Sequence, residues 1–203
     1  MPAYCEQARS YERDTCEFQP YRLAIVEALP VRPGQVVLDV GCGTGLCFGP
    51  LRDKVTALGG VVGIEESPEM AAVARDRIAA EGWLNVMVVE SRAEDAGMAF
   101  TADAALFCAV HDIMQSPDAL RNVLGCLRPG AWVAAGGGKW AAPLMVAVNM
   151  HVRMLHAPYV RSFDGFDRPW NHLEQLIEGI HVDEVAFGGG YIATGRVPPR
   201  APA

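Results

Sequence analysis

Residues 36–45 have the sequence VVLDVGCGTG. Its first five residues are apolar except for Asp39, a composition typical of a strand that is covered on both faces. Gly41, Gly43 and Gly45 follow at alternate positions. Glycines at a strand-to-helix turn let the backbone approach a ligand closely, and the free N–H groups of the next helix favour a carboxylate or phosphate. The stretch therefore predicts a ligand site at the carboxyl end of the first strand.

Further apolar runs follow this strand and alternate with helical patterns. That alternation is typical of βαβ units and predicts an α/β fold with a doubly wound, mostly parallel seven-stranded sheet. The last two strands flank three consecutive glycines at 188–190, which predicts an antiparallel hairpin at the sheet edge. The strand candidates are residues 36–40, 61–65, 86–90, 104–108, 132–135 and two strands within 181–196.

Two helices of this core begin with the same local signal. Ser67-Pro68-Glu69 and Ser116-Pro117-Asp118 each combine an N-cap hydroxyl, a proline at the first helical position and an acidic residue in the first turn. We expect the first helix to reach about Glu81 and the second to reach Leu127, after which residues 128–130 turn the chain into the next strand. Further helices are expected at 3–13, 20–29, 143–156 and 169–178.

Composition bounds the class of protein. A chain of 203 residues with 51% hydrophobic residues suits one domain. The formal charge is −7 and no cluster of Lys and Arg occurs, which argues against a nucleic-acid substrate. The amino terminus is polar and charged, unlike a secretory signal, and the longest apolar stretch, 141–150, is too short to span a bilayer. We expect a cytoplasmic protein with no transmembrane segment and read that stretch as a core or pocket helix.

The six cysteines form no C-x-x-C pair and no Cys/His spacing typical of zinc sites. Buried thiols that act as small hydrophobic groups are the better interpretation. His151 and His156 are five residues apart, so they do not share the helix face that a metal pair at i and i+4 needs. No metal is expected.

The glycine spacing argues against two other ligands. A dinucleotide-binding turn needs G-x-G-x-x-G, but after Gly43 and Gly45 the next glycine is Gly49. A P-loop needs Ser or Thr after its lysine, whereas Lys139 precedes Trp140. From the glycines alone, a tight turn without a ligand remains an alternative.

An acidic residue ends the second strand. Glu65 lies 20 residues after Gly45, at the edge where the glycine turn is expected. A carboxylate in that place can accept two hydrogen bonds from the diol of a ribose, as in other nucleoside-binding α/β folds. Together the turn and the carboxylate favour a nucleoside ligand.

The sequence resembles the class I S-adenosylmethionine-dependent methyltransferases, particularly small-molecule enzymes of the ubiquinone/menaquinone-biosynthesis type. The resemblance covers about residues 36–135 and implies their Rossmann-like fold. It rests on several motifs in the family's order and spacing. These are VVLDVGCGTG, VVGIEESPEM, the pair Ala93-Glu94, ADAALF and LRPGAWV.

The resemblance implies S-adenosylmethionine as the cofactor. Gly41, Gly43 and Gly45 would pack against its methionine part, Asp39 would orient its amino group, and Glu65 would hold its ribose hydroxyls. The neighbours Cys42 and Glu66 are assigned to the same site.

Adenine recognition departs from the family pattern. The family usually has an acidic residue after the third strand that recognises the adenine amino group, whereas Arg92 stands at that position here. Ala93 is expected to offer a backbone N–H to the ring, and Glu94 or Asp95 are alternatives for the missing carboxylate.

The chemistry should lie beyond the fourth strand. Methyl transfer from a sulfonium is a direct displacement, so the protein must align the reactants and exclude water. A general base is needed only for a protonated acceptor, and histidine suits that role. His111 and Asp112 follow the fourth strand at the glycine-turn edge and are the catalytic candidates; the alternative is that His111 only shapes the pocket.

The resemblance also suggests a layout for a single domain, 1–203. Residues 1–34 would form a helical lid, 35–139 the cofactor core, 140–180 an acceptor cap and 181–197 the edge strands. Trp140 is a candidate pocket wall, and Met145, Met150 and Met154 are expected to pack in the core rather than touch the acceptor. The apolar cap favours a small apolar or aromatic acceptor.

Two interpretations, each from a different class of protein, stay open. An NAD(P)-dependent oxidoreductase shares the sheet and the ribose carboxylate but lacks its glycine fingerprint here. A non-catalytic module could keep the nucleoside site for sensing. The sequence also leaves a homodimer open.

Overall fold

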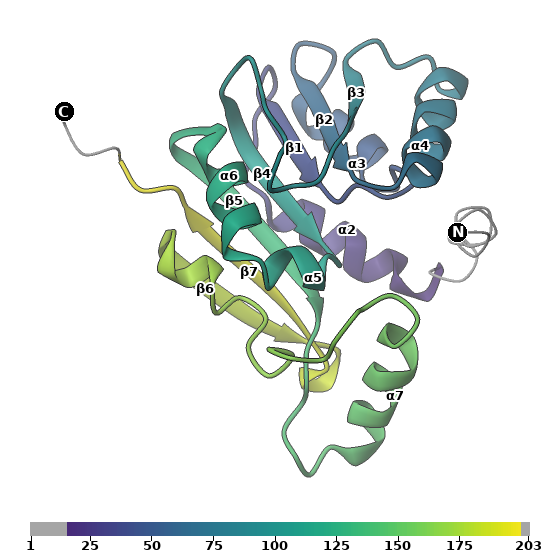
Figure 1. Ribbon diagram of the computed structural model, residues 1–203, viewed down its shortest axis with the longest axis vertical. Helices are drawn as coiled ribbons and strands as arrows, with labels where there is room; N and C mark the ends of the chain where they lie inside the picture. The colour runs from purple at the N-terminus through teal and green to yellow at the C-terminus, as the bar shows by residue number, and fades with distance from the viewer. Residues whose placement is uncertain (1–15, 200–203) are drawn as a thin grey trace.

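The computed structural model describes residues 16–199, and these fold around one seven-stranded sheet (Figure 1). The strand order is β3-β2-β1-β4-β5-β7-β6. The first five strands pair in parallel, and β7 runs antiparallel to both β5 and β6, which confirms the expected fold class and the edge hairpin. The strands are β1 Val36–Val40, β2 Gly60–Glu65, β3 Val86–Glu90, β4 Ala102–Cys108, β5 Leu127–Gly138, β6 Glu178–Val185 and β7 Gly190–Arg196.

Helices cover both faces of the sheet. Buried side chains of α2, α3 and α4 form one hydrophobic layer with the sheet, and those of α5 and α6 form the other. The side chains of Ser67 and Ser116 accept hydrogen bonds from the first turns of α4 and α6, which confirms both predicted caps. The α-helices are α2 Gln19–Ala28, α3 Phe48–Val55, α4 Pro68–Ala80, α5 His111–Met114, α6 Pro117–Gly125 and α7 Val146–His156, and the 3-10 turns are η1 Cys16–Phe18, η2 Leu173–Gln175 and η3 Ala186–Gly188.

Several predicted boundaries are wrong near β5. The helix predicted to reach Leu127 ends at Gly125, because the chain joins β5 as soon as Leu127 pairs with Ala102. The predicted turn at 128–130 lies inside β5, where Gly130 takes a positive φ of 76° and bends the strand instead of ending it. At its other end β5 stops at Gly138, two residues before Trp140.

The cap differs most from expectation. The helix predicted at 169–178 is wrong: that segment holds only η2 before β6 begins at Glu178. The ring of Trp170 packs against that of Tyr191 with centroids 5.0 Å apart and a tilt of 48°, so the segment is held by individual contacts and not by a continuous helical face. The helix expected at 143–156 is present from Val146 as α7. The helix expected at 3–13 lies outside the described residues.

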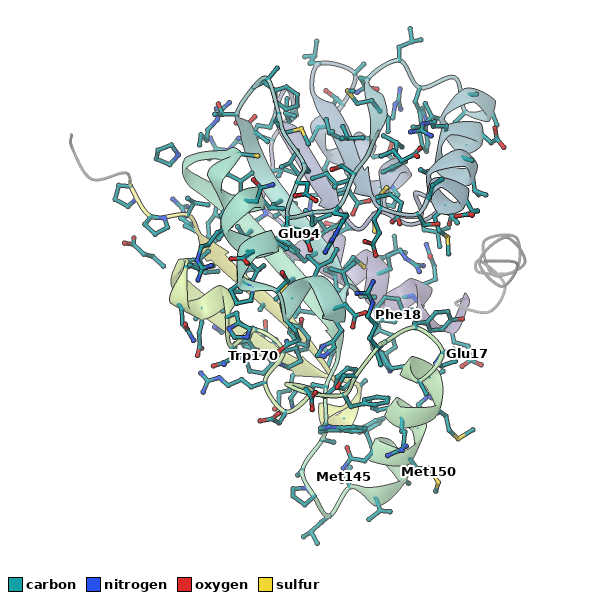
Figure 2. All side chains as sticks on the ribbon, in the orientation of Figure 1. Glu17, Phe18, Glu94, Met145, Met150 and Trp170 are labelled. Carbon is teal, nitrogen blue, oxygen red and sulfur yellow. The ribbon has the colours of Figure 1, made fainter. Side chains whose placement is uncertain are left out.

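The methionines of the cap do not pack in the core. Met145 is 39% exposed, Met150 59% and Met154 71%, so that prediction is wrong. Figure 2 shows Met145 and Met150 on the outer side of the α7 region, away from the sheet. The reason is that α7 lies at the edge of the fold and buries only Val152 completely, so most of its apolar residues have no protein surface to face.

Candidate functional site

The glycine turn adopts a backbone that favours glycine. Gly41, Gly43 and Gly45 have φ values of 66°, 54° and 78°. A Cβ on Gly41 would lie 2.6 Å from Val110, and a Cβ on Gly45 would lie 2.6 Å from the ring of Phe48, so protein packs against both. Within the part of the chain that the structure describes, a Cβ on Gly43 would meet nothing within 4 Å. Gly43 therefore faces open space at the carboxyl end of β1.

Glu65, at the end of β2, holds this turn in place. One carboxylate oxygen accepts a hydrogen bond from Gly43 N–H at 2.8 Å, and the other accepts one from Ser67 N–H at 2.9 Å. The side chain is buried to 9% exposure, and burial raises the pKa of Glu65. Because each carboxylate oxygen has a second lone pair, both can still accept hydrogen bonds from a ligand.

Asp39, on β1, is a buried carboxylate with an unsatisfied atom. It is 1% exposed, and within the described residues its Oδ2 has no hydrogen-bond partner. Burial raises the pKa of Asp39 to about 7, against the lowering effect of Arg22. An unpaired buried acceptor costs about 1–3 kcal/mol, so the atom suits a ligand that donates a hydrogen bond.

Arg22 was missed in the sequence. It lies on α2 with only 4% of its surface exposed, and its charge acts on Asp39. Its signal is a single arginine on the helix face that carries the buried residues Ile25 and Val26.

A cavity of about 430 Å³ lies beside the turn, bounded by the ends of β1, β2, β3 and β4. The main-chain N–H of Ala93 donates no hydrogen bond within the described chain, while its carbonyl accepts one from Asn122. Of the predicted cofactor residues, the structure brings five to this wall. These are Gly41, Glu65, Glu66, Arg92 and Ala93.

Charged residues form the rim of this cavity. Arg92 pairs with Glu94 and lies 4.0 Å from Glu66. Arg161, from the cap, lies 3.3 Å from Glu66 and 3.5 Å from Asp112, so it bridges the two sides of the opening. Asp112 therefore lies at the mouth of the 430 Å³ cavity.

A second cavity of about 290 Å³ adjoins the first, and the two share Ala109, Val110, His111 and Tyr159. Its walls are mainly aromatic and aliphatic, and Lys and Arg are absent from its lining in the described chain. Phe18, at the start of α2, lies near the end of α7 in Figure 2. The side chains that close it come from η1 and α2, α7 and the cap loop; they include Phe18, Tyr21, Leu155, His156 and Phe166.

His111 lies between the two cavities. Its ring is 4.3 Å from that of Phe166, and its Nε2 donates a hydrogen bond to the carbonyl of Asp164 at 2.9 Å. Its Nδ1 then carries the lone pair, but that atom is buried without a partner among residues 16–199. Burial lowers the pKa of His111. Trp140 packs behind Phe166, with ring centroids 5.4 Å apart, and lines neither cavity.

A third cavity of about 410 Å³ continues the second between α7 and β7. His151, Leu155 and His156 line both, as do Gly137 and Gly138 at the end of β5. The site thus consists of a polar cavity at the glycine turn and an apolar space that extends away from it.

Within residues 16–199, no cluster of three or more His, Cys, Asp or Glu side chains is arranged to hold a metal ion. No helix in this range has both the length and the apolar character needed to cross a membrane.

The chain is similar to known methyltransferases. Residues 37–130 match a family described as a methyltransferase domain. Over 141 residues the chain is 31% identical to aklanonic acid methyltransferase DauC of a Streptomyces species, covering 68% of this chain and 61% of that protein. Over 137 residues it is 31% identical to demethylmenaquinone methyltransferase of Shouchella clausii, covering 66% of this chain and 51% of that protein. The chain thus spans half to three fifths of these relatives.

Solved structures show the same fold. A SAM-dependent methyltransferase from Aquifex aeolicus superimposes with a TM-score of 0.61 at 19% identity, over 87% of this chain and 89% of that one. Because the sequence identity is this low, the match supports the fold and gives no information on the substrate.

Proposed function

We propose that this chain, which belongs to the class I S-adenosylmethionine-dependent methyltransferases, transfers a methyl group to a small acceptor of apolar or aromatic character. The observation that carries the proposal is the pairing of two adjoining cavities. One is polar and lies at the glycine turn, and the other is apolar and shares His111 with it. A methyl donor in the first would face an acceptor in the second.

The residues at the glycine turn fit the methionine and ribose parts of the cofactor. The unpaired Oδ2 of Asp39 can accept a hydrogen bond from an amino group. The open side of Gly43 leaves room for a ligand at the backbone. Glu65 is already held by Gly43 and Ser67 and has lone pairs left for the ribose hydroxyls. Gly41, Cys42 and Gly45 shape the turn around them.

The adenine would lie toward the end of β3. The main-chain N–H of Ala93 is available there, and Glu66 and Arg92 stand at the same wall. Arg92 is paired with Glu94, so the carboxylate of Glu94 is already engaged by a cation at the rim. We assign recognition of the ring to the Ala93 backbone and not to a side chain.

The cofactor supplies an activated methyl group. The protein aligns the acceptor with that methyl group and excludes water from the site. Phe166 and Tyr21 would hold a planar acceptor, and the rings exclude water from the methyl group. His111 fixes the cap loop through Asp164, and Asp112 holds Arg161 at the rim. In the layout we propose, residues 16–34 of the lid and 140–180 of the cap enclose an acceptor bound to the 35–139 core.

Transfer of radiolabel tests this function. The protein is incubated with methyl-labelled S-adenosylmethionine and a panel of aromatic and aliphatic acceptors, and labelled product is extracted into organic solvent. The proposal expects label on at least one apolar acceptor and none on a matched acceptor that carries a phosphate. Cofactor binding without transfer to any member of the panel would favour a non-catalytic module instead.

A further inference from the structure

His156, the last residue of α7, stands where the two apolar cavities meet. Its Nδ1 lies 2.8 Å from the carbonyl oxygen of Val152, one turn earlier in the helix. A carbonyl can only accept, so Nδ1 carries the hydrogen and Nε2 of the neutral ring carries the lone pair. Among residues 16–199 no hydrogen bond to Nε2 is formed, and the ring lines both apolar cavities.

The position of Nε2 follows from its distance to Gly138. A Cβ on Gly138 would fall 2.3 Å from Nε2, which is nearer to it than the other ring atoms. Gly138 ends β5 and lines both apolar cavities. Nε2 of His156 therefore packs beside Gly138, at the wall that the two apolar cavities share, and the absence of a side chain at Gly138 is what makes room for the ring.

The surroundings keep His156 neutral. Burial lowers the pKa of His156, and His111 on α5 and His151 on α7 lower it further. No lysine or arginine lines either cavity in the described chain. The other titratable groups that face this space come from η1, α2, β7 and the chain after α7; they are Glu17, Tyr21, Tyr159 and Tyr191.

We propose that the acceptor is an aromatic compound with a free hydroxyl group and that Nε2 of His156 takes the hydroxyl proton during transfer; this rests on the function proposed above. The O–H bond breaks and its proton passes to Nε2, giving an imidazolium. The oxygen lone pair forms the bond to the methyl carbon while the C–S bond breaks, and that electron pair stays on sulfur. The products are a methyl ether and the demethylated cofactor.

The cavity chemistry selects this acceptor class. A carboxylate or phosphate acceptor would bring a negative charge into a space where residues 16–199 place no lysine or arginine on the walls. A neutral hydroxyl enters without that penalty, but it needs a base to become a good nucleophile. Phe166 lies 5.5 Å from the His156 ring in an edge-on arrangement, so a planar ring can stack in the same cluster.

Two probes of one shape separate the base from the pocket. 2-Naphthol must lose a proton, whereas naphthalene-2-thiol is largely ionised at pH 8 and needs no base. In His156→Asn the side-chain amide can still donate to the Val152 carbonyl, but the Nε2 position is lost. We expect kcat for 2-naphthol to fall by about 10²- to 10⁴-fold, the usual contribution of a general base, and kcat for the thiol to change by less than about threefold.

The matched control is His172→Asn, because His172 lines none of the three cavities. Equal losses of kcat on both probes in His156→Asn would overturn the base role. Transfer by the wild type to the thiol but not to 2-naphthol would overturn the hydroxyl class, and so would cofactor binding with transfer to neither probe. Absence of cofactor binding in calorimetry would instead overturn the proposed function itself.

A second measurement does not depend on turnover. Imidazole ¹⁵N spectra of the whole protein report which ring nitrogen carries the hydrogen, and His156→Asn assigns the signal. We expect His156 to be neutral at pH 7 with the hydrogen on Nδ1, and the Nε2 signal to shift when 2-naphthol is added with S-adenosylhomocysteine. A hydrogen on Nε2, or no shift with 2-naphthol, would contradict the proposal.

Discussion

The carboxylate of Glu65 accepts a hydrogen bond from the main-chain N–H of Gly43 at 2.8 Å, across 22 residues of sequence. The same side chain accepts one from Ser67 N–H, at the start of α4. One carboxylate therefore joins the glycine turn, the end of β2 and the next helix. A residue that the family pattern assigns to the ribose also preorganises the turn before any ligand binds.

Gly43 and Gly45 should respond differently to alanine. Gly45→Ala places a Cβ 2.6 Å from the Phe48 ring at a positive φ, so we expect a loss of about 2–4 kcal/mol in the free energy of unfolding. Gly43→Ala meets only the positive φ and open space, so about 1 kcal/mol is expected, together with loss of cofactor binding. Urea unfolding and calorimetry on both variants check this contrast; equal destabilisation would contradict it.

Cofactor affinity should rise with pH through the titration of Asp39. The pKa of Asp39 is raised to about 7, so the carboxyl is mostly protonated at pH 6 and mostly ionised at pH 7.5. The ionised form attracts the charged amino group of the cofactor, and binding must therefore release a proton below pH 7. We expect roughly tenfold tighter binding at pH 7.5 than at pH 6. Calorimetry in buffers of different ionisation enthalpy measures the released proton.

Asp39→Asn is the matched variant for that titration. It keeps the size of the side chain and removes its charge, so we expect about tenfold to hundredfold weaker binding and a flat pH dependence between pH 6 and 7.5. A slope equal to that of the wild type would show that another group titrates.

The rate of methyl transfer should fall only at pH values below the usual pKa of a histidine side chain. Burial lowers the pKa of both His111 and His156, so each is neutral at pH 7 and gains its proton at lower pH than an exposed histidine. A base works when neutral, and with the cofactor at saturation, so that titration of Asp39 does not limit binding, kcat/KM for a hydroxyl acceptor should rise with pH and level off with an apparent pKa below about 6.5. An acid limb centred above 7 would contradict this assignment.

Arg161 should affect cofactor exchange more than stability. Its side chain is 78% exposed and lies within reach of Glu66 and Asp112 across the cavity opening. Exposed ion pairs contribute at most about 1 kcal/mol, so Arg161→Met should unfold in urea almost as the wild type does. We expect cofactor dissociation to be severalfold faster in stopped-flow experiments. Arg121→Met, which removes the exposed pair with Asp118, should leave dissociation unchanged.

Local signals explain which elements were predictable. The apolar runs of β1 and β3 set their bounds, and the serine caps at Ser67 and Ser116 set the starts of two helices. These signals act over a few residues and do not depend on the rest of the fold. The positive φ values of Gly41, Gly43 and Gly45 follow from the same kind of local chemistry.

Contacts between distant segments were not predictable in this way. Arg22 reaches Asp39 only because α2 packs against the sheet, and no spacing rule joins the two residues. The cap is held by single contacts such as Trp170 with Tyr191, so a helical composition at 169–178 did not give a helix. The sequence gives no signal for the position of the His156 ring, because its relation to Gly138 depends on where α7 meets the end of β5.

We propose that the turn at Gly43 and the carboxylate of Glu65 together form a site for S-adenosylmethionine. Calorimetric titration with S-adenosylmethionine, S-adenosylhomocysteine and NAD tests it on the wild type, on Glu65→Ala and on the exposed control Glu81→Gln. We predict binding of the first two ligands and not of NAD, and an affinity about tenfold to hundredfold weaker in Glu65→Ala, corresponding to roughly 1.5–3 kcal/mol, with the control unchanged. Binding of NAD alone, or wild-type affinity in Glu65→Ala, would contradict the account.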